Sequence, residues 1–565
     1  MVAVIGNSIS EGIKGRFNLW AIAAILVAGS FLMPVVAVLA TAAGDSGGLW
    51  QHLFTTVLPR YVFNTVSLMV GVGALSILFG VTTAWVVFRY EFYGRQWCQW
   101  ILLLPAAIPA YLIAYTYTDF LEYAGPVQGL LRNFFGWQSA REYWFPEIRS
   151  MGGAIFVMSA VLYPYVYVIA RTAFLLTPSS YFEAARISGR NMFWSVGIPL
   201  ARPAIVAGVA LVMMETISDF GTVEYFAIET LTLGIFNVWL GMNNLAAAAQ
   251  IATCAFLFII LLLLVEILAR AKRRFVDTSR NSVSFLPKPL DGWRAGFCIF
   301  FCLFPVVVGF VTPVSVLVGF IIEGHSTALT TAMFDAAVNS ILIGCSVASL
   351  VVATAAFMGL VASFNKNLIV QRLTAISSFG YAFPGTILAV GVVMAGGALD
   401  THIAKISKNI FGWEYSGGLT SGVTLVIFAC VVRFQAVGYG AVKSGLARIS
   451  DSMVEASRVL GHGLGQTMGS VILPMIRLSC VAGGLLVFVD VMKELPMTLL
   501  LRPFDFETLA TYVYQFAKDE MLEKAALPAL AIVLTGVIPV IVMNAALNRF
   551  QNPHTSNHKI TSKSL

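Results

Sequence analysis

The sequence predicts an all-α polytopic membrane protein with about 12 transmembrane helices, arranged as two parallel six-helix repeats. Of its 565 residues, 58% are hydrophobic and only 11% are charged, whereas a soluble domain carries roughly 25% charged residues. The apolar runs are continuous, which favours helices over membrane β-strands, whose residues alternate over about ten positions. A soluble protein is therefore excluded.

Twelve apolar runs approach or exceed the roughly 20 residues that a helix needs to cross the hydrocarbon of a bilayer. The first run is too long for a typical signal-peptide core, so we expect it to remain as a helix. Six runs precede a basic stretch and six follow it. The expected spans are 19–40, 62–88, 100–120, 152–175, 204–227, 246–269, 296–322, 339–364, 373–395, 418–437, 478–501 and 527–547.

Lysine and arginine are concentrated in alternate loops, with Lys14, Arg16, Arg433 and the stretch 270–294 among those on one side. Because positive loops stay on the cytoplasmic side, the pattern predicts a multi-pass protein of the cell inner membrane with both termini cytoplasmic. We interpret the basic stretch as a linker, with binding to membrane lipid headgroups as the alternative. The net charge of +7 therefore gives no reason to expect a nucleic-acid partner.

The two halves repeat one set of landmarks at a spacing of 275 residues (384 − 109). These landmarks are Asn64-Thr65 with Asn339-Ser340, Pro109 with Pro384, and Pro199 with Pro474. We expect a first half at 1–275, a basic cytoplasmic linker at 276–293, a second half at 294–550 and a cytoplasmic tail at 551–565. Since six spans return the chain to the same side, both halves insert the same way up, which predicts a path between them.

A patterned polar segment occurs once in each half, at 181–203 and at 453–474. Each contains an acid, two small residues, a glycine six residues after the acid, and an aliphatic residue followed by proline. The segments contribute Glu183, Ala184, Ala185, Gly189 and Pro199 in the first half, and Glu455, Ala456, Gly461, Leu473 and Pro474 in the second. The first copy is three residues shorter between its glycine and its proline. A repeated pattern of this kind suggests a docking surface for a partner.

The motifs E-A-A-x3-G at 183–189 and E-A-S-x3-G at 455–461 resemble the EAA loop of binding-protein-dependent ABC importer permeases. The resemblance implies the type I (MetI-like) importer fold and alternating access. It also implies that these loops are short cytoplasmic helices that dock on two copies of an ABC ATPase subunit. A periplasmic solute-binding protein would deliver the cargo.

Four further motifs resemble the fused ferric-iron permeases, which implies Fe(III) as the cargo. They are ETISDFGT at 215–222, FPGT at 383–386, KELPMT at 493–498 and LLRPFDFETLATYVY at 500–514. Fused permeases for thiamine and for 2-aminoethylphosphonate share much of this pattern, so these two compounds remain alternative cargoes.

The chain contains no Gly-x4-Gly-Lys-Ser/Thr phosphate loop, the backbone cradle and lysine with which many ATPases hold nucleotide. We therefore expect this chain not to be an enzyme, with ATP hydrolysis on a separate subunit. Its histidines show no ligand spacing and no catalytic or redox arrangement is recognisable. We expect no cofactor and no permanent metal.

Each half carries two acids in its fifth apolar run, 16 and 20 residues after the motif proline (215 − 199 and 219 − 199). They are Glu215 and Asp219 in the first half, and Asp490 and Glu494 in the second. A spacing of four predicts that each pair shares one helix face. Acids inside a membrane are costly and usually face a cavity or a partner. Lys493 and other polar groups could neutralise them, or they could line the passage of a hard cation such as Fe(III), which prefers oxygen ligands.

Pro109 and Pro384 are expected to kink the third and ninth spans, and either could act as a gating hinge. The loops 122–149 and 502–524 carry aromatic and charged residues that suit interface anchoring or docking of a binding protein. An ion-gradient-driven secondary transporter with twelve helices is the rival of another class. However, the loop 89–95 lacks the Gly-x3-Asp-Arg-x-Gly-Arg-Arg pattern of that family. A membrane-embedded enzyme or assembly factor is a further rival.

Overall fold

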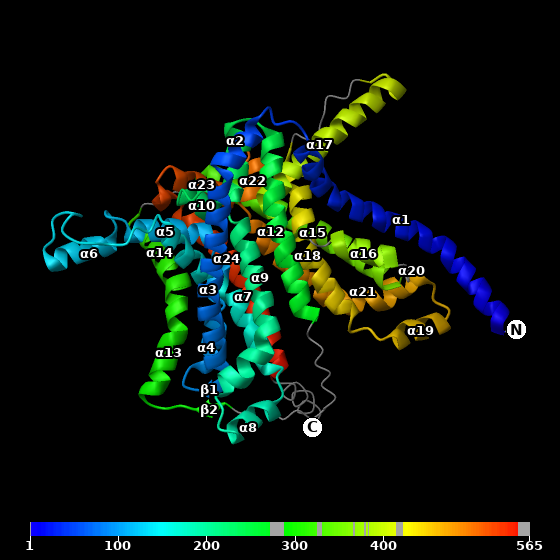
Figure 1. The fold of residues 1–565 in the computed structure, drawn as a ribbon. Helices are drawn as coiled ribbons and strands as arrows, with labels where there is room; N and C mark the ends of the chain where they lie inside the picture. Colours follow the sequence, from blue (N-terminus) through cyan, green and yellow to red (C-terminus); the bar gives the residue numbers. More distant parts are fainter. Residues whose placement is uncertain are drawn as a thin grey trace. The chain divides into compact units, whose positions relative to one another are not determined.

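The computed structural model describes residues 2–271, 287–324, 330–364, 368–377, 380–381, 383–413 and 422–551. The chain forms two compact units. Figure 1 shows its helices coloured along the sequence. Unit 1 consists of Met1–Gln51, Ile235–Cys254 and Thr331–Thr511, and unit 2 consists of His52–Gly234, Ala255–Thr330 and Tyr512–Leu565. Each unit therefore combines the middle of one sequence half with terminal segments of the other half.

Unit 2 contains the middle of the first half. Its helical elements are α3 (Leu58–Arg89), α4 (Arg95–Ile101), η1 (Leu104–Ala107), α5 (Ala110–Leu121), α6 (Pro126–Phe135), α7 (Met151–Leu175), α8 (Ser179–Ile187), η2 (Phe193–Gly197), α9 (Ile198–Ser218), α10 (Gly221–Tyr225), α13 (Trp293–Val306), η4 (Val307–Val311), α14 (Thr312–Ile322), η8 (Leu522–Ala525) and α24 (Ala526–Gln551). A short parallel pair joins β1 (Tyr90–Glu91) to β2 (Lys288–Pro289). The chain passes between the units within α2 (Leu49–Thr56), α11 (Leu231–Phe236), α12 (Leu245–Ala271) and α23 (Leu509–Lys518).

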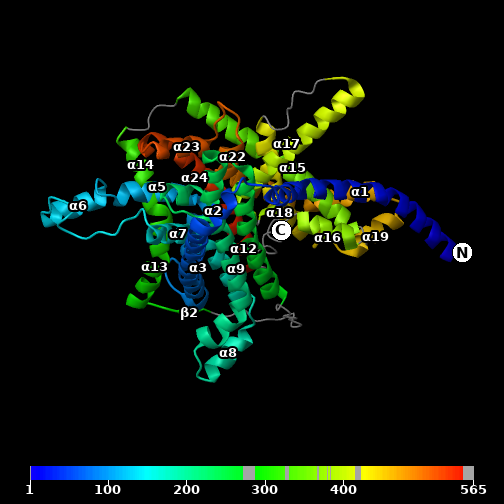
Figure 2. The ribbon, with the colours of Figure 1, turned by 45° about the horizontal axis from the view of Figure 1, so that its top comes forward.

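The centre of unit 2 is a bundle of the three long helices α3, α7 and α9. Small residues allow these helices to approach closely, as is typical of packing between membrane helices. At Gly80 of α3, a Cβ atom would lie 2.8 Å from the Cβ of Val166 and 2.9 Å from the backbone nitrogen of Tyr167 on α7. The bundle therefore holds α8, which follows α7, at a fixed end of the unit (Figure 2).

Unit 1 contains the middle of the second half. Its helical elements are α1 (Val2–Ala42), η3 (Asn237–Gly241), α15 (Thr331–Phe364), α16 (Leu368–Ser377), α17 (Gly385–Ile406), η6 (Ser407–Phe411), α18 (Val423–Leu446), α19 (Asp451–Val459), α20 (Leu464–Thr467), η7 (Met468–Ile472), α21 (Leu473–Met492) and α22 (Pro496–Leu501). Its centre is the bundle of α15, α18 and α21.

The helix α1 packs on α15, α16 and α17 of the second half (Figure 1). Ala24 of α1 is buried in a cluster with Val361 and Val370. At Gly391 of α17, a Cβ atom would lie 2.4 Å from the backbone oxygen of Pro34. The first helix of the chain therefore completes a unit whose other long helices come from the second half.

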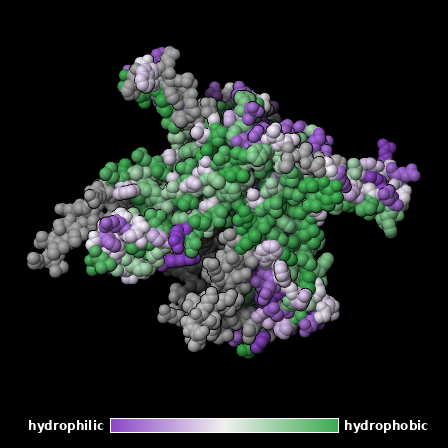
Figure 3. All heavy atoms as spheres, turned by 180° about the vertical axis from the view of Figure 1, so that it is seen from behind, coloured by the Kyte–Doolittle hydropathy of each residue, from purple (hydrophilic) through white to green (hydrophobic). Residues whose placement is uncertain are grey.

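The membrane-spanning character predicted from the sequence is confirmed. Among the described residues, 11 helices are long and apolar enough to cross a membrane, and a bent pair raises the number to 12 if it counts as one span. The bent pair is Arg95–Ala107 with Ala110–Phe135, at an angle of 91°, and it stands where the span 100–120 was expected. On the face drawn in Figure 3, hydrophobic residues cover a broad part of the described surface.

Pro109 and Pro384 both stand directly before a helix. Pro109 precedes α5 with an extended backbone (ψ 144°), and Pro384 precedes α17 in the same way (ψ 140°). The predicted kink at Pro109 is confirmed, because the third span bends by 91° at the break between Ala107 and Ala110, whereas the kink at Pro384 stays a prediction. Proline fits the helix start because it has no N–H to donate and it holds the preceding residue extended. Their role as hinges stays a prediction.

The repeat of 275 residues is visible in the helices themselves. The helix α9 begins at Ile198 and α21 begins at Leu473, at this spacing (473 − 198). The helices α3 and α7 correspond to α15 and α18 in the same order. The fifth span of each half ends nine residues earlier than expected (227 − 218 and 501 − 492), at Ser218 and at Met492. Each is followed by a short helix, α10 or α22.

Candidate functional site

The two patterned polar segments both fold as a nine-residue helix, α8 in unit 2 and α19 in unit 1. We call α8 and α19 the coupling helices. They match residue for residue at a spacing of 272 (451 − 179 and 459 − 187). The acids Glu183 and Glu455 are exposed in both, as are Ala184 and Ala456.

The glycine of each motif ends its helix. Gly189 and Gly461 have positive φ angles of 66° and 85°, which favour glycine. After Gly189, the Arg190 N–H donates to the Ala185 carbonyl at 2.9 Å, and the equivalent bond after Gly461 is 3.2 Å long. This is the Schellman arrangement of a helix C-terminus. The acid lies within the helix and the glycine ends it, so the spacing of six residues is set by the point at which the helix ends.

Each coupling helix has a buried side and an exposed apolar side. Ala185 and the equivalent Ser457 are buried, at 7% and 5% exposure. Ile187 and the equivalent Val459 are 85% and 86% exposed. In the second segment Leu460 is also exposed. An apolar strip in the same position on both helices is suited to a partner.

The first coupling helix is anchored by aromatic contacts within unit 2. Phe182 of α8 is fully buried, with its ring 5.4 Å from Phe88 and 6.1 Å from Trp85. Trp85 also lies 5.3 Å from Phe174 of α7 and 5.1 Å from Phe193 of η2. We call these five residues the aromatic seat. Motion of α8 is thereby coupled to α3 and α7 by packing.

The second coupling helix is anchored by polar contacts within unit 1. The Ser457 hydroxyl lies 3.0 Å from the Thr467 hydroxyl and 3.2 Å from His462 Nδ1. The predicted aliphatic-proline ends, Pro199 and Leu473-Pro474, form the first turns of α9 and α21. The extra three residues of the second segment lie in α20, a helical turn that precedes η7.

Asp219 has a structural partner in unit 2. Its Oδ1 accepts from the backbone N–H of Thr222 at 2.9 Å, and its Oδ2 accepts from the Thr222 hydroxyl at 3.2 Å. A carboxylate in this position caps the first turn of α10. Asp219 directly follows Ser218, the last residue of α9, and is the C-cap of that helix. That it shares a helix face with Glu215 stays a prediction.

Glu494 takes the equivalent position in unit 1 and has an additional partner. Its carboxylate accepts from the backbone N–H groups of Met497 and Thr498, each at 3.1 Å, and so caps α22. It also pairs with Arg433 of α18, whose Nη1 lies 3.1 Å from Oε1. Both side chains are buried, at 9% and 2% exposure. The helix α21 ends at Met492, so Glu494 lies two residues beyond the helix that carries Asp490.

The sequence did not predict the pair of Arg433 and Glu494, because the distribution of basic residues assigned Arg433 to a cytoplasmic loop. The arginine lies instead within α18. Its position inside an apolar run was the available signal, since a charge within a membrane helix generally has a partner.

The remaining two acids differ in their surroundings. Asp490 pairs with Lys493 at 3.1 Å, as one interpretation of the sequence anticipated. Glu215 lies on α9, is partly buried, and has no hydrogen bond or ion pair to another residue that the structure describes. Within the described parts of the chain, no group of three or more His, Cys, Asp or Glu residues could hold a metal ion.

The landmark Asn64-Thr65 of α3 fixes the loop between α10 and α11. The Asn64 side chain donates to the Glu229 carbonyl at 3.0 Å, and the Thr65 hydroxyl accepts from the Leu231 N–H at 3.0 Å. These bonds satisfy backbone groups that lie away from regular helix.

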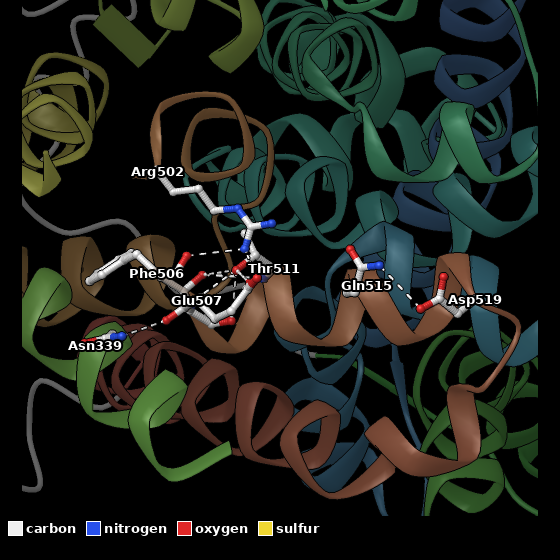
Figure 4. Close-up of polar contacts among 8 residues, drawn as sticks. Asn339, Arg502, Phe506, Glu507, Thr511, Gln515 and Asp519 are labelled. Atoms are coloured by element: carbon white, nitrogen blue, oxygen red, sulfur yellow. Dashed lines mark hydrogen bonds and ion pairs between the residues drawn. The ribbon is translucent and has the colours of Figure 1, made fainter. Parts of the chain in front are cut away.

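The second landmark makes the same bonds in unit 1, and Figure 4 shows the one between Asn339 and Glu507. The Asn339 side chain donates to the Glu507 carbonyl at 3.0 Å, and the Ser340 hydroxyl accepts from the Leu509 N–H at 2.7 Å. Glu507 also accepts from the Thr511 hydroxyl and pairs with Arg502. The repeated landmark residues therefore hold a loop in place by hydrogen bonds to its backbone, a role that the sequence did not predict.

Comparison with known proteins agrees with this geometry. The family described as "Binding-protein-dependent transport system inner membrane component" matches twice, at residues 76–276 and 352–553. Each match contains one coupling helix. The two matches cover more than half of the chain.

Two relatives of this chain, both permeases of ferric transport systems, match most of its length. The Fe(3+)-transport system permease protein FbpB 2 of Haemophilus influenzae is 24% identical over 87% of this chain and 91% of its own length. The ferric transport system permease protein FbpB of Actinobacillus pleuropneumoniae is 21% identical over 81% and 67%. The sulfate transport system permease protein CysW of Escherichia coli is 28% identical over 37% of this chain and 70% of its own length.

These relatives are transport permeases and not enzymes, and this type of permease works in general with an ATPase and a binding protein. These matches favour an ABC importer over the ion-gradient-driven secondary transporter. With two copies of the family's sequence pattern, two matching coupling helices and 11 to 12 apolar spans, the chain belongs to the binding-protein-dependent transport system inner membrane components, the permeases of ABC importers.

Proposed function

We propose that this permease carries ferric iron from a periplasmic binding protein to the cytoplasm by alternating access. The observation that carries this proposal is the extent of the likeness to ferric permeases, which includes both halves. The sulfate permease matches only 37% of this chain. Thiamine and 2-aminoethylphosphonate are the alternative cargoes.

Two copies of a separate ATPase subunit dock on the coupling helices in this proposal, one on α8 and one on α19. The equivalent exposed residues Ile187 and Val459 support two equivalent docking sites. The coupling helices, the basic linker and both termini are on the cytoplasmic side. The chain itself needs no cofactor, because nucleotide is bound and hydrolysed by its partner.

The experiment that tests the cargo is ATPase activity of the reconstituted complex. The chain and its ATPase are placed in proteoliposomes, and binding proteins loaded with Fe(III), thiamine, 2-aminoethylphosphonate or sulfate are added in turn. Stimulation by the Fe(III)-loaded protein alone is the expected result. Stimulation by a different loaded protein contradicts iron as the cargo but leaves the importer class intact.

We expect Glu215→Gln to lower the rate of Fe(III) uptake by about tenfold, the effect of losing roughly 1.4 kcal/mol of contact with the cation. Glu215 is singled out because Asp219, Asp490 and Glu494 already have partners of their own. Uptake is measured per folded complex in proteoliposomes. Asp219→Asn is the matched control, since it removes a carboxylate charge but keeps an amide oxygen for the cap, and it should leave uptake per folded complex unchanged.

Normal uptake by Glu215→Gln, together with normal stimulation of the ATPase, would remove Glu215 from the passage. The cargo experiment above is independent of this result.

A further inference from the structure

A groove with a volume of about 590 Å³ lies in unit 2 between the end of α3 and the start of α13. Its walls are mainly apolar and aromatic. They include Trp85 and Val86 of α3, Phe193 of η2, and Trp293, Phe297 and Phe301 of α13. The three residues of α13 are spaced by four and therefore share one helix face. Trp293 and Phe297 are 78% and 61% exposed, so the groove presents apolar surface that the described residues do not cover.

The groove lies at the level where two spans end. The span Leu58–Arg89 ends beside it and the span Trp293–Ile322 begins there. Tryptophan and basic residues at the ends of membrane helices are typical of the headgroup region. The surface is therefore next to lipid headgroups as well as to acyl chains.

Two cations line the same groove. Lys288 is held by the pairing of β2 with β1, in which it lies opposite Tyr90, and the Leu290 N–H donates to the Glu91 carbonyl at 2.8 Å. Arg294 follows in the first turn of α13. Neither cation has a carboxylate partner among the residues that the structure describes. An anion placed at this end of the groove would be attracted by both.

We propose that this groove binds one anionic phospholipid, with an acyl chain along the aromatic wall and the headgroup phosphate at Lys288 and Arg294. The aromatic wall and the two cations together identify the ligand. A free phosphate would leave the apolar wall uncovered, and an uncharged lipid would leave the two cations unpaired. Lys288 of the basic linker thus contacts one lipid headgroup specifically, in addition to the general positive charge of the linker.

The site adjoins the first coupling helix. Trp85 and Phe193 belong both to the groove wall and to the aromatic seat that holds Phe182 of α8. The bound lipid therefore packs against the seat of α8. The positions equivalent to Trp85 and Phe193 in the second half are Leu360 and Met468 (360 − 85 and 468 − 193, each 275), so these two aromatic residues of the wall are not repeated in unit 1.

The test is native mass spectrometry of the purified full-length chain in detergent with phosphatidylglycerol and phosphatidylcholine of identical acyl chains. We expect a preference for phosphatidylglycerol in the unaltered chain. Lys288→Gln with Arg294→Gln should weaken phosphatidylglycerol binding about 30-fold and phosphatidylcholine binding much less, because the choline group offsets the charge of its phosphate. The matched control removes the exposed pair Lys443 and Arg477 by the same substitutions and should leave both unchanged.

A second comparison tests the apolar wall. Phe297→Ala should weaken binding of both lipids about tenfold, the effect of removing a buried aromatic contact. Phe300→Ala is its control, because Phe300 is on the same helix with a similar exposure of 65% but does not line the groove. Equal effects of the two phenylalanine variants would overturn the site. Unchanged lipid selectivity in the Lys288 and Arg294 variant, or displacement of lipid by millimolar inorganic phosphate, would overturn the anionic phospholipid.

Discussion

Arg433→Met is expected to destabilise unit 1 by about 3–5 kcal/mol, the usual cost of removing one partner from a buried ion pair. The variant leaves the Glu494 carboxylate in a site that is 2% exposed. Its two bonds to backbone N–H groups remain, but the compensating positive charge is lost. The shift is measured as the thermal unfolding temperature of the purified full-length chain in detergent, followed by tryptophan fluorescence.

A double variant separates the charge from the loss of packing. Arg433→Met with Glu494→Gln removes both charges and keeps an amide oxygen for the cap, so it should regain much of the lost stability. Arg477→Met, an exposed arginine near the start of α21, is the control and should change the unfolding temperature little. If Arg433→Met were no more destabilising than Arg477→Met, the ion pair would have no structural role.

Gly385 explains why this ion pair occurs in the second half alone. A Cβ atom there would lie 2.5 Å from Arg433 Nη1 and 3.1 Å from Glu494 Oε1. The equivalent positions of Gly385 and Arg433 in the first half are Ala110 and Met158 (385 − 110 and 433 − 158, each 275). The glycine of the FPGT motif therefore makes room for the pair, and the first half has neither.

Ile187→Asp combined with Val459→Asp is expected to weaken ATPase binding by at least about 30-fold, which corresponds to the roughly 2 kcal/mol of an interface hot spot. Both side chains are more than four-fifths exposed, so the permease itself should fold normally. A charge at either position cannot be buried in the interface with the ATPase without a large desolvation cost. Affinity is measured by titrating the ATPase onto the detergent-purified chain.

Single variants add information about stoichiometry. If each coupling helix binds one ATPase copy, Ile187→Asp and Val459→Asp should each remove about half of the bound ATPase at saturation. Tyr93→Asp is the control, because Tyr93 is 93% exposed in the loop between α3 and α4, outside both coupling helices. Full binding by the double variant would disprove docking on these strips, whereas equal loss with Tyr93→Asp would indicate a general effect of charge.

The sequence predicted the long helices and the coupling helices because both depend on local pattern. Hydrophobic runs set the spans, and a glycine at a fixed distance from an acid set the end of α8 and of α19. The breaks after α9 and α21 could not be predicted in the same way. They arise where Asp219 and Glu494 cap a second short helix, whereas apolar residues continue on both sides of these positions.

The partners of charged residues also depend on the fold. Arg433 is 61 residues from Glu494 in the sequence (494 − 433), and no local pattern connects them. Likewise, no hydropathy profile reveals that α1 packs with helices of the other half, because an apolar helix suits lipid and protein neighbours equally well.

The placement of α1 has a consequence for how the chain is made. Ala24 contacts residues that lie more than 330 positions later, such as Val361 (361 − 24). During synthesis, α1 enters the membrane long before α15, α16 and α17 exist, so it must wait in lipid without its native neighbours. Neither compact unit can be completed until the ribosome has translated most of the second half, and a truncated first half would leave α1 as an orphan helix open to quality-control proteases.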